Sequence, residues 1–172
     1  MRPFAPEPLA YFLTWTTFGT WLPGDSRGWA NRGVCRGPNP RLRRMAARLT
    51  HDRPVGFGQV ERELVEQVIA GHCQVRGWML HAVHCRAEHV HVVVSARDRE
   101  PGVVIGEFKA WCTRALRAAG RIADVGATWG HGGSCRRLYD AFAVERVVMY
   151  VRECQDGPRH ARGGGRRNAL PW

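Results

Sequence analysis

Residues 78–94 have the sequence WMLHAVHCRAEHVHVVV, and this stretch decides the fold. Two apolar runs, 78–83 and 89–94, flank a polar link from Cys85 to Glu88. Runs this short and this rich in apolar and β-branched residues favour strands over helices. The stretch therefore predicts two antiparallel strands joined as a hairpin.

Amphipathic helices are expected on both sides of this hairpin. Before it, Val60, Leu64 and Val68 recur every four residues, and the pattern ends near Gly77. After it, residues 102–119 carry a second apolar stripe, formed by Phe108, Trp111, Cys112, Ala115 and Leu116.

Three further elements complete the order. Aromatic and β-branched residues predict a first strand over 11–18, a possible short strand covers 135–139, and a last helix covers 144–154. The order strand, helix, strand, strand, helix, strand, helix is that of a ferredoxin-like fold. We expect an α+β, RRM-like antiparallel sheet with helices on one face, plus a C-terminal helix that bears Tyr150.

The chain of 172 residues has room for one core, which we assign to a domain over 1–158. Residues 26–58, rich in Arg, Gly and Pro, are expected to form a long connection with a short helix near 41–49. The tail 159–172 is basic and Gly-rich, and we expect it to be disordered.

Charge favours a polyanionic partner, since the chain carries 26 basic residues and a net charge of +11. Lys109 is the single lysine, so compositional bias explains arginine over lysine but not the excess of basic over acidic residues. No apolar run approaches a membrane span, and the N-terminus lacks a secretory signal pattern, so we expect a soluble, cytoplasmic protein without a membrane partner. Six cysteines without a C-x-x-C pair are expected to be reduced thiols rather than zinc ligands.

A histidine pair lies in the second strand of the hairpin. His89 and His91 are two residues apart, so both imidazoles project from one face while Val90 points into the core. Two neutral imidazoles side by side suit a divalent metal ion, although two polar-face histidines without a role fit the same pattern. A histidine-triad hydrolase would need a third histidine at position 93, which is Val93.

Three motifs in this order carry a family resemblance. They are His89-Val90-His91, a helix containing Phe108-Lys109-Ala110-Trp111, and the tyrosine-bearing segment 147–155; the segment 17–25 adds to them. Over roughly 10–158 the chain resembles the single-tyrosine HUH transposases of the IS200/IS605 type, and within them is most similar to the REP-associated tyrosine transposases.

The resemblance implies a covalent mechanism on single-stranded or hairpin DNA. Tyr150 would attack a phosphodiester to leave a 5′-phosphotyrosine and a free 3′-hydroxyl, and His89 and His91 would bind Mg²⁺ or Mn²⁺. Two other tyrosines compete: Tyr11, expected to be packed, and Tyr139, which follows two arginines. Tyr150 falls at the margin of the apolar sector of its helix, formed by Val144, Val147, Val148 and Val151.

The resemblance also implies a third metal ligand after the tyrosine. Gln155 is the preferred candidate because an amide oxygen suits Mg²⁺ or Mn²⁺. It lies five residues after Tyr150, about 140° beyond its face, so it joins the site only if the helix bends there. Cys154 and Glu153 are the alternatives.

Several side chains are candidates for DNA contacts. Lys109 is expected to hold a phosphate or to be an ordinary surface lysine, and Arg114, Arg136 and Arg137 are further backbone candidates. Trp21, Trp29 and Trp129 would stack on unpaired bases or pack in the protein.

The sequence thus predicts a metal-dependent single-strand DNA endonuclease and strand transferase of the transposase class, with a homodimer as one possible assembly. A rolling-circle initiator or relaxase shares the chemistry. A non-catalytic nucleic-acid-binding module on an RRM-like fold, or a metallohydrolase unrelated to DNA, are the alternatives from other classes.

Overall fold

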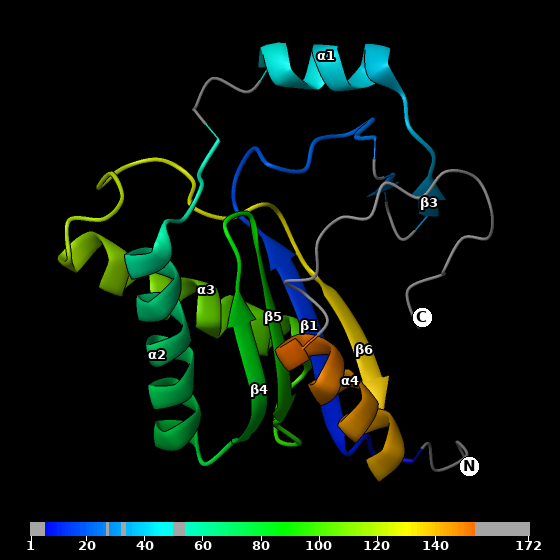
Figure 1. The fold of residues 1–172 in the computed structure, drawn as a ribbon, viewed down its shortest axis with the longest axis vertical. Helices are drawn as coiled ribbons and strands as arrows, with labels where there is room; N and C mark the ends of the chain where they lie inside the picture. The colour runs from blue at the N-terminus through cyan, green and yellow to red at the C-terminus, as the bar shows by residue number, and fades with distance from the viewer. Residues whose placement is uncertain (1–5, 27, 32–33, 50–53, 154–172) are drawn as a thin grey trace.

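The computed structural model describes residues 6–26, 28–31, 34–49 and 54–153. Its elements follow the chain as β1 (Ala10–Thr16), β2 (Trp29–Asn31), β3 (Val34–Arg36), α1 (Pro40–Leu49), α2 (Gln59–Arg76), β4 (Met79–Cys85), β5 (His89–Ser95), α3 (Pro101–Ala118), β6 (Ser134–Leu138) and α4 (Ala141–Glu153) (Figure 1). The predicted α+β class with a ferredoxin-like, antiparallel sheet is confirmed.

Four strands form the main sheet, in the order β4-β5-β1-β6 with every pair antiparallel. The predicted hairpin is the β4–β5 pair, which has a register irregularity between Leu80 and Ala82. β1 runs between β5 and β6, so its residues are cross-strand neighbours of both. This arrangement places the histidine-bearing strand next to the centre of the sheet.

Helices cover both faces of the sheet (Figure 1). On one face α2 and α3 pack over Leu13, Trp15 and the even-numbered valines of β5, with Phe108 fully buried between them. On the other face α4 packs over Phe12 and Val93. Because side chains alternate along a strand, β5 sends its valines at 90, 92 and 94 into the larger core. His89 and His91 therefore lie on the α4 side.

The helices agree with the sequence prediction except at two places. These are the first residue of α4 and the burial of Trp111 in α3. α2 ends at Gly77, whose φ of 68° forms the left-handed cap. α4 begins before the expected position 144, because the Asp140 carboxylate accepts a hydrogen bond from the Ala143 N–H at 2.7 Å. Trp111 is 47% exposed and does not belong to the buried stripe of α3, since it lies at the stripe's edge under Arg114.

The segment 26–58 is more structured than a simple connection. The short helix expected near 41–49 is confirmed as α1, but the β2–β3 hairpin was not predicted. The first strand ends at Thr16, because Thr17 leaves it to form a bridge with Trp129. The tail 159–172 lies outside the described residues.

Cys73, Cys85, Cys112 and Cys135 are free thiols, of which the first three are buried and the last is exposed. In the same described part of the chain, no helix is long and apolar enough to cross a membrane.

Candidate active site

A row of polar side chains crosses the sheet beneath α4. His91 on β5 is the cross-strand partner of His84 on β4 and of Thr14 on β1. His89, one pleat along, is the partner of Thr16. Cross-strand partners share a face, so these residues gather on the side that α4 covers.

The two predicted metal ligands form a close pair. The ring centroids of His89 and His91 are 4.7 Å apart with an interplanar angle of 84°. The His91 ring stacks on Phe12 at 5.7 Å, and the Thr14 Oγ1 lies 3.0 Å from its Nδ1. The hydrogen bond at Nδ1 leaves Nε2 as the atom of His91 that can bind a further group.

Burial keeps the His91 imidazole neutral. His91 is 8% exposed, and this burial, with smaller contributions from His89, His84 and Arg86, lowers its pKa to about 3. A neutral imidazole is the form that binds metal ions, because the lone pair must be available. The His91 imidazole is therefore held in the form that a metal ligand needs.

Tyr150 lies beside this pair. Its ring centroid is 6.3 Å from that of His91 and 6.3 Å from that of Phe12, edge-on in both cases. Val147 and Val151, buried on either side of it in α4, hold the helix against the sheet. Tyr150 itself is half-buried at the edge of this apolar contact, as the sequence predicted. The fold thus brings together the histidine motif and the tyrosine from distant parts of the chain.

The donor set fits a divalent ion in part. An imidazole nitrogen binds such an ion at about 2.1 Å, so two rings this close can reach one ion between them. Thr14 supplies the outer hydrogen bond that usually orients a ligating histidine. Among the described residues, however, no group of three or more His, Cys, Asp and Glu side chains has a metal-binding arrangement. Gln155 and Cys154 lie outside these residues, and Glu153 is exposed at the end of α4.

The predicted DNA contacts are divided between the two faces. Arg136 is the cross-strand partner of Phe12 and shares its face with the histidine pair. Arg137 points the other way, and its guanidinium lies 3.3 Å from the Glu100 carboxylate. Arg114 lies on α3 over the Trp111 ring, in the opposite helical layer. Arg136 is thus the arginine of this set that the fold places with the candidate site.

Lys109 braces a loop rather than standing in open solvent. Its ammonium donates to the carbonyl oxygens of Gly130, at 2.8 Å, and Gly132. The Gly130 N–H in turn donates to the carbonyl of Thr16, the cross-strand partner of His89. Burial lowers the pKa of Lys109. Two of its three donors are engaged, so one donor is left for the predicted phosphate contact.

The three tryptophans named from the sequence differ in environment. Trp129 packs edge-on against Trp15 and Phe57, and its indole N–H donates to the Thr113 hydroxyl at 2.9 Å. Trp29 is half-buried beneath the Arg36 guanidinium. Trp21 is 44% exposed, so it is the one whose ring has accessible area for a base.

Three residues of the site were missed in the sequence: Phe12, Thr14 and His84. Alternation along the first strand was the available signal, because Phe12, Thr14 and Thr16 must share a face. Two threonines on that face indicate a polar surface rather than a core. Knowing that this strand pairs with the histidine strand would have placed Thr14 beside His91.

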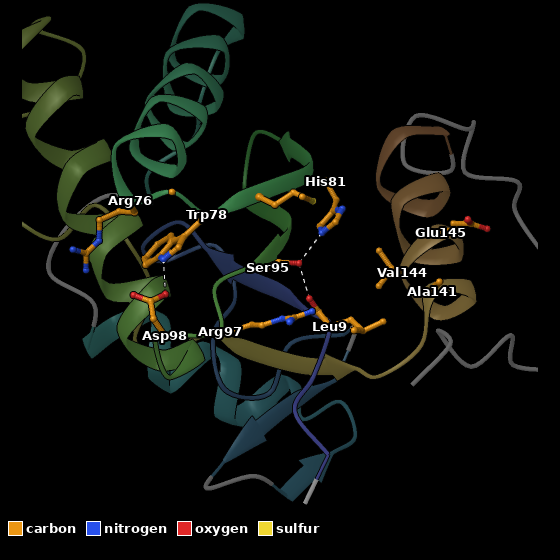
Figure 2. Close-up of a pocket in the computed structure, with 12 residues that line it drawn as sticks. Leu9, Arg76, Trp78, His81, Ser95, Arg97, Asp98, Ala141, Val144 and Glu145 are labelled. Atoms are coloured by element: carbon orange, nitrogen blue, oxygen red, sulfur yellow. Dashed lines mark hydrogen bonds between the residues drawn. The ribbon is translucent and has the colours of Figure 1, made fainter.

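A pocket lies at the other end of the α4 face, away from the histidine pair (Figure 2). It has a volume of about 740 Å³ and is lined on one side by Ala141 and Val144 of α4. Within it the Ser95 hydroxyl donates to the Leu9 carbonyl at 2.5 Å and lies 2.8 Å from His81 Nε2. Because the hydroxyl proton is used by Leu9, His81 donates to Ser95 and does not activate it as a nucleophile.

Comparisons with known proteins found similarity at the level of solved structures. No family model matches the chain. No curated protein sequence matches it either. The chain is similar to a solved structure of a REP-associated tyrosine transposase bound to a REP hairpin, with 12% sequence identity and a TM-score of 0.46, over 88% of this chain and 68% of that one. At this identity and TM-score the match does not assign a function.

Proposed function

We propose that this protein is a metal-dependent single-strand DNA endonuclease and strand transferase of the transposase class, with Tyr150 as its nucleophile. The observation that carries the proposal is the position of the Tyr150 ring, 6.3 Å from His91 on the face where His89 and His91 pair. A phenol beside a histidine pair that would hold a divalent ion combines a nucleophile with a group that activates the phosphate. The order of the motifs in the sequence supports the same class.

In the proposed cleavage step, one bond to phosphorus forms as another breaks, and one proton is lost as another is taken up. The Tyr150 oxygen forms a bond to phosphorus and loses its proton, while the bond from phosphorus to the 3′-oxygen breaks and that oxygen takes up a proton. The product is a 5′-phosphotyrosine and a free 3′-hydroxyl. Because the ester retains the energy of the broken bond, attack by a 3′-hydroxyl rejoins DNA without a nucleotide cofactor.

Each neighbouring side chain has a task in this step. His89 and His91 would hold Mg²⁺ or Mn²⁺, which supplies charge withdrawal from the phosphate oxygens when bound. Thr14 orients His91 through its Nδ1, and Phe12 packs against both His91 and Tyr150. Arg136 adds a positive charge on the same face for the DNA backbone.

A binding module of the RRM type is disfavoured by α4. Such modules stack bases on an open sheet face. Here α4 packs on the face opposite α2 and α3, with Val147 and Val151 buried against Phe12 and Val93. The sheet therefore lacks the open aromatic platform that this alternative needs in the region under α4.

A covalent adduct tests the proposal. A pool of single-stranded DNA hairpins labelled at the 3′ end is incubated with Mn²⁺ or with EDTA, and label that stays on the denatured protein is measured. We expect a Mn²⁺-dependent adduct with the wild type and with Tyr139→Phe, a control at an exposed tyrosine. We expect none with Tyr150→Phe. An adduct that survives this substitution would exclude Tyr150, and DNA binding with no adduct from any protein would leave only the binding function.

A further inference from the structure

We propose that α1 is a second nucleic-acid contact, at which exposed arginines bind the phosphate backbone of the DNA strand that leads to the candidate active site. This inference rests on the proposed function, because it names where flanking DNA lies. The sequence of α1 is PRLRRMAARL, with four arginines and no acidic residue. None of its residues is buried.

The arginines of α1 divide into one that anchors the helix and three that face outward. Arg43 Nε lies 3.9 Å from the carboxylate of Asp25, whose side chain is 5% exposed. Arg41, Arg44 and Arg48 are exposed, and their spacing of three and four residues places them on one face of the helix. Within the described residues, none of these three forms a salt bridge with an acidic side chain.

The start of α1 is fixed to the loop before β2. The Asn39 side chain accepts a hydrogen bond from the Leu42 N–H at 3.0 Å, as an N-cap. The Asn39 N–H donates to the Gly24 carbonyl at 3.0 Å. At Gly24 φ is +87°, and a Cβ there would lie 2.3 Å from the Asn39 oxygen, so only glycine fits this approach. An isolated helix this short is marginal in water, and these contacts keep it formed.

The same loop is tied to the candidate active site. The Thr17 hydroxyl and the Thr17 N–H both donate to the carbonyl of Glu88, the residue before His89, and the Thr20 hydroxyl donates to the Thr17 carbonyl at 2.9 Å. In Figure 1, α1 lies beyond the end of the sheet at which β1 ends and β5 begins. His89 and Thr16 are at this end of the strands. A DNA strand that reaches Tyr150 from this end of the sheet passes toward α1.

Spacing and charge favour a nucleic acid as the occupant. Arg41 and Arg48 are seven positions apart, or about 10 Å along the helix axis, which is about the rise of three nucleotides. The neighbouring face of α1 carries Met45 and Leu49, 60% and 73% exposed. A basic helix with apolar residues also suits an anionic membrane surface. The short apolar face and the connection to the histidine strand favour DNA over lipid.

Salt-dependent binding tests the proposal. Fluorescence anisotropy of a labelled single-stranded DNA hairpin with long single-stranded flanks is measured in EDTA at several salt concentrations. The test variant is R44Q/R48Q, and the control R62Q/R121Q removes the charges of Arg62 on α2 and of Arg121 just after α3, where Arg121 pairs with Glu61. We expect the test variant to reduce the slope of log affinity against log salt by about 1.5 and to weaken binding about tenfold or more at low salt. The control should change affinity by less than about twofold.

Each outcome decides between the two proposals. Equal slopes for the test and control variants, with normal wild-type binding and normal melting, would overturn the role of α1 and leave the proposed function standing. If the wild type neither binds DNA nor forms an adduct, both the role of α1 and the proposed function are overturned. Loss of binding to phosphatidylglycerol vesicles in R44Q/R48Q, with unchanged DNA affinity, would assign α1 to lipid instead. Shortening the flanks should abolish the difference between the two variants if α1 contacts flanking DNA.

Discussion

The hydroxyl oxygen of Thr14 lies 3.0 Å from Nδ1 of His91, across the pairing of β1 with β5. When Nε2 supplies the lone pair for a metal ion, Nδ1 carries the proton and donates it to the threonine oxygen. The bond therefore fixes both the rotation of the ring and its tautomer. A neighbouring strand, remote in sequence, thus orients the metal-binding atom of His91.

Replacing this hydroxyl should weaken metal binding while the fold is retained. Thr14→Val keeps the shape of the side chain but removes the acceptor, and loss of such an outer hydrogen bond costs about 10- to 100-fold in metal affinity. The concentration of Mn²⁺ that supports half-maximal adduct formation measures the effect. Thr14→Ser, which retains the hydroxyl, should bind as the wild type does. Equal behaviour of the two variants would show that the bond does not orient His91.

Acid should destabilise the metal-free protein through His91. Its folded-state pKa is lowered to about 3, whereas an unfolded histidine titrates near about 6.5. The contribution is therefore fully present above about pH 6.5 and is lost as pH falls from there toward 3. The slope contributed by one such group is at most about 1.4 kcal/mol per pH unit.

Urea unfolding at a series of pH values in EDTA measures this slope. His91→Gln should flatten the curve between pH 6.5 and pH 4, since glutamine fills similar space without titrating. A control substitution at the exposed His131 leaves His91 in place, so the pH dependence of its unfolding free energy should match that of the wild type. An identical pH profile for His91→Gln and the wild type would mean that the buried imidazole does not govern acid stability.

The main elements were predictable from local patterns. α2 and the β4–β5 hairpin have clear periodicity and clear ends, so the predicted helix boundary at Gly77 was confirmed. The β2–β3 hairpin could not be predicted in the same way, because strands of three residues are too short to show alternation. Trp111 was misassigned because a position at the edge of a helical stripe can face either way.

The candidate site was predictable only in its motif residues. The histidine pair follows from its spacing and Tyr150 from the family resemblance, and the structure places them together. Thr14 and Phe12 depend on strand pairing, which periodicity within one strand does not reveal. Lys109 was expected to face outward, but its contacts to Gly130 and Gly132 depend on a loop whose path no local pattern fixes.

Arg136 and Arg137 should differ in their effect on DNA binding, although they are adjacent. Arg136 lies on the face of the histidine pair, whereas Arg137 is bound to Glu100 on the other side. Arg136→Gln should reduce the salt slope of DNA affinity by about one and weaken all sequences alike. Arg137→Gln removes the same charge and should leave the slope close to that of the wild type. The reverse order would place the DNA on the opposite face of the sheet.

Removing the Lys109 ammonium should lower stability, because it leaves two loop carbonyls without their donor. Lys109→Met keeps the apolar stem, and losing hydrogen bonds from a charged donor costs about 1–3 kcal/mol. Urea unfolding measures this change, and salt-dependent binding of the same variant separates the predicted phosphate contact from the structural role. A smaller salt slope in the folded variant would indicate that the third donor of the ammonium also reaches DNA. Unchanged stability would contradict the bracing of the loop at Gly130 and Gly132, and with it the support that this loop gives to Thr16 beside His89.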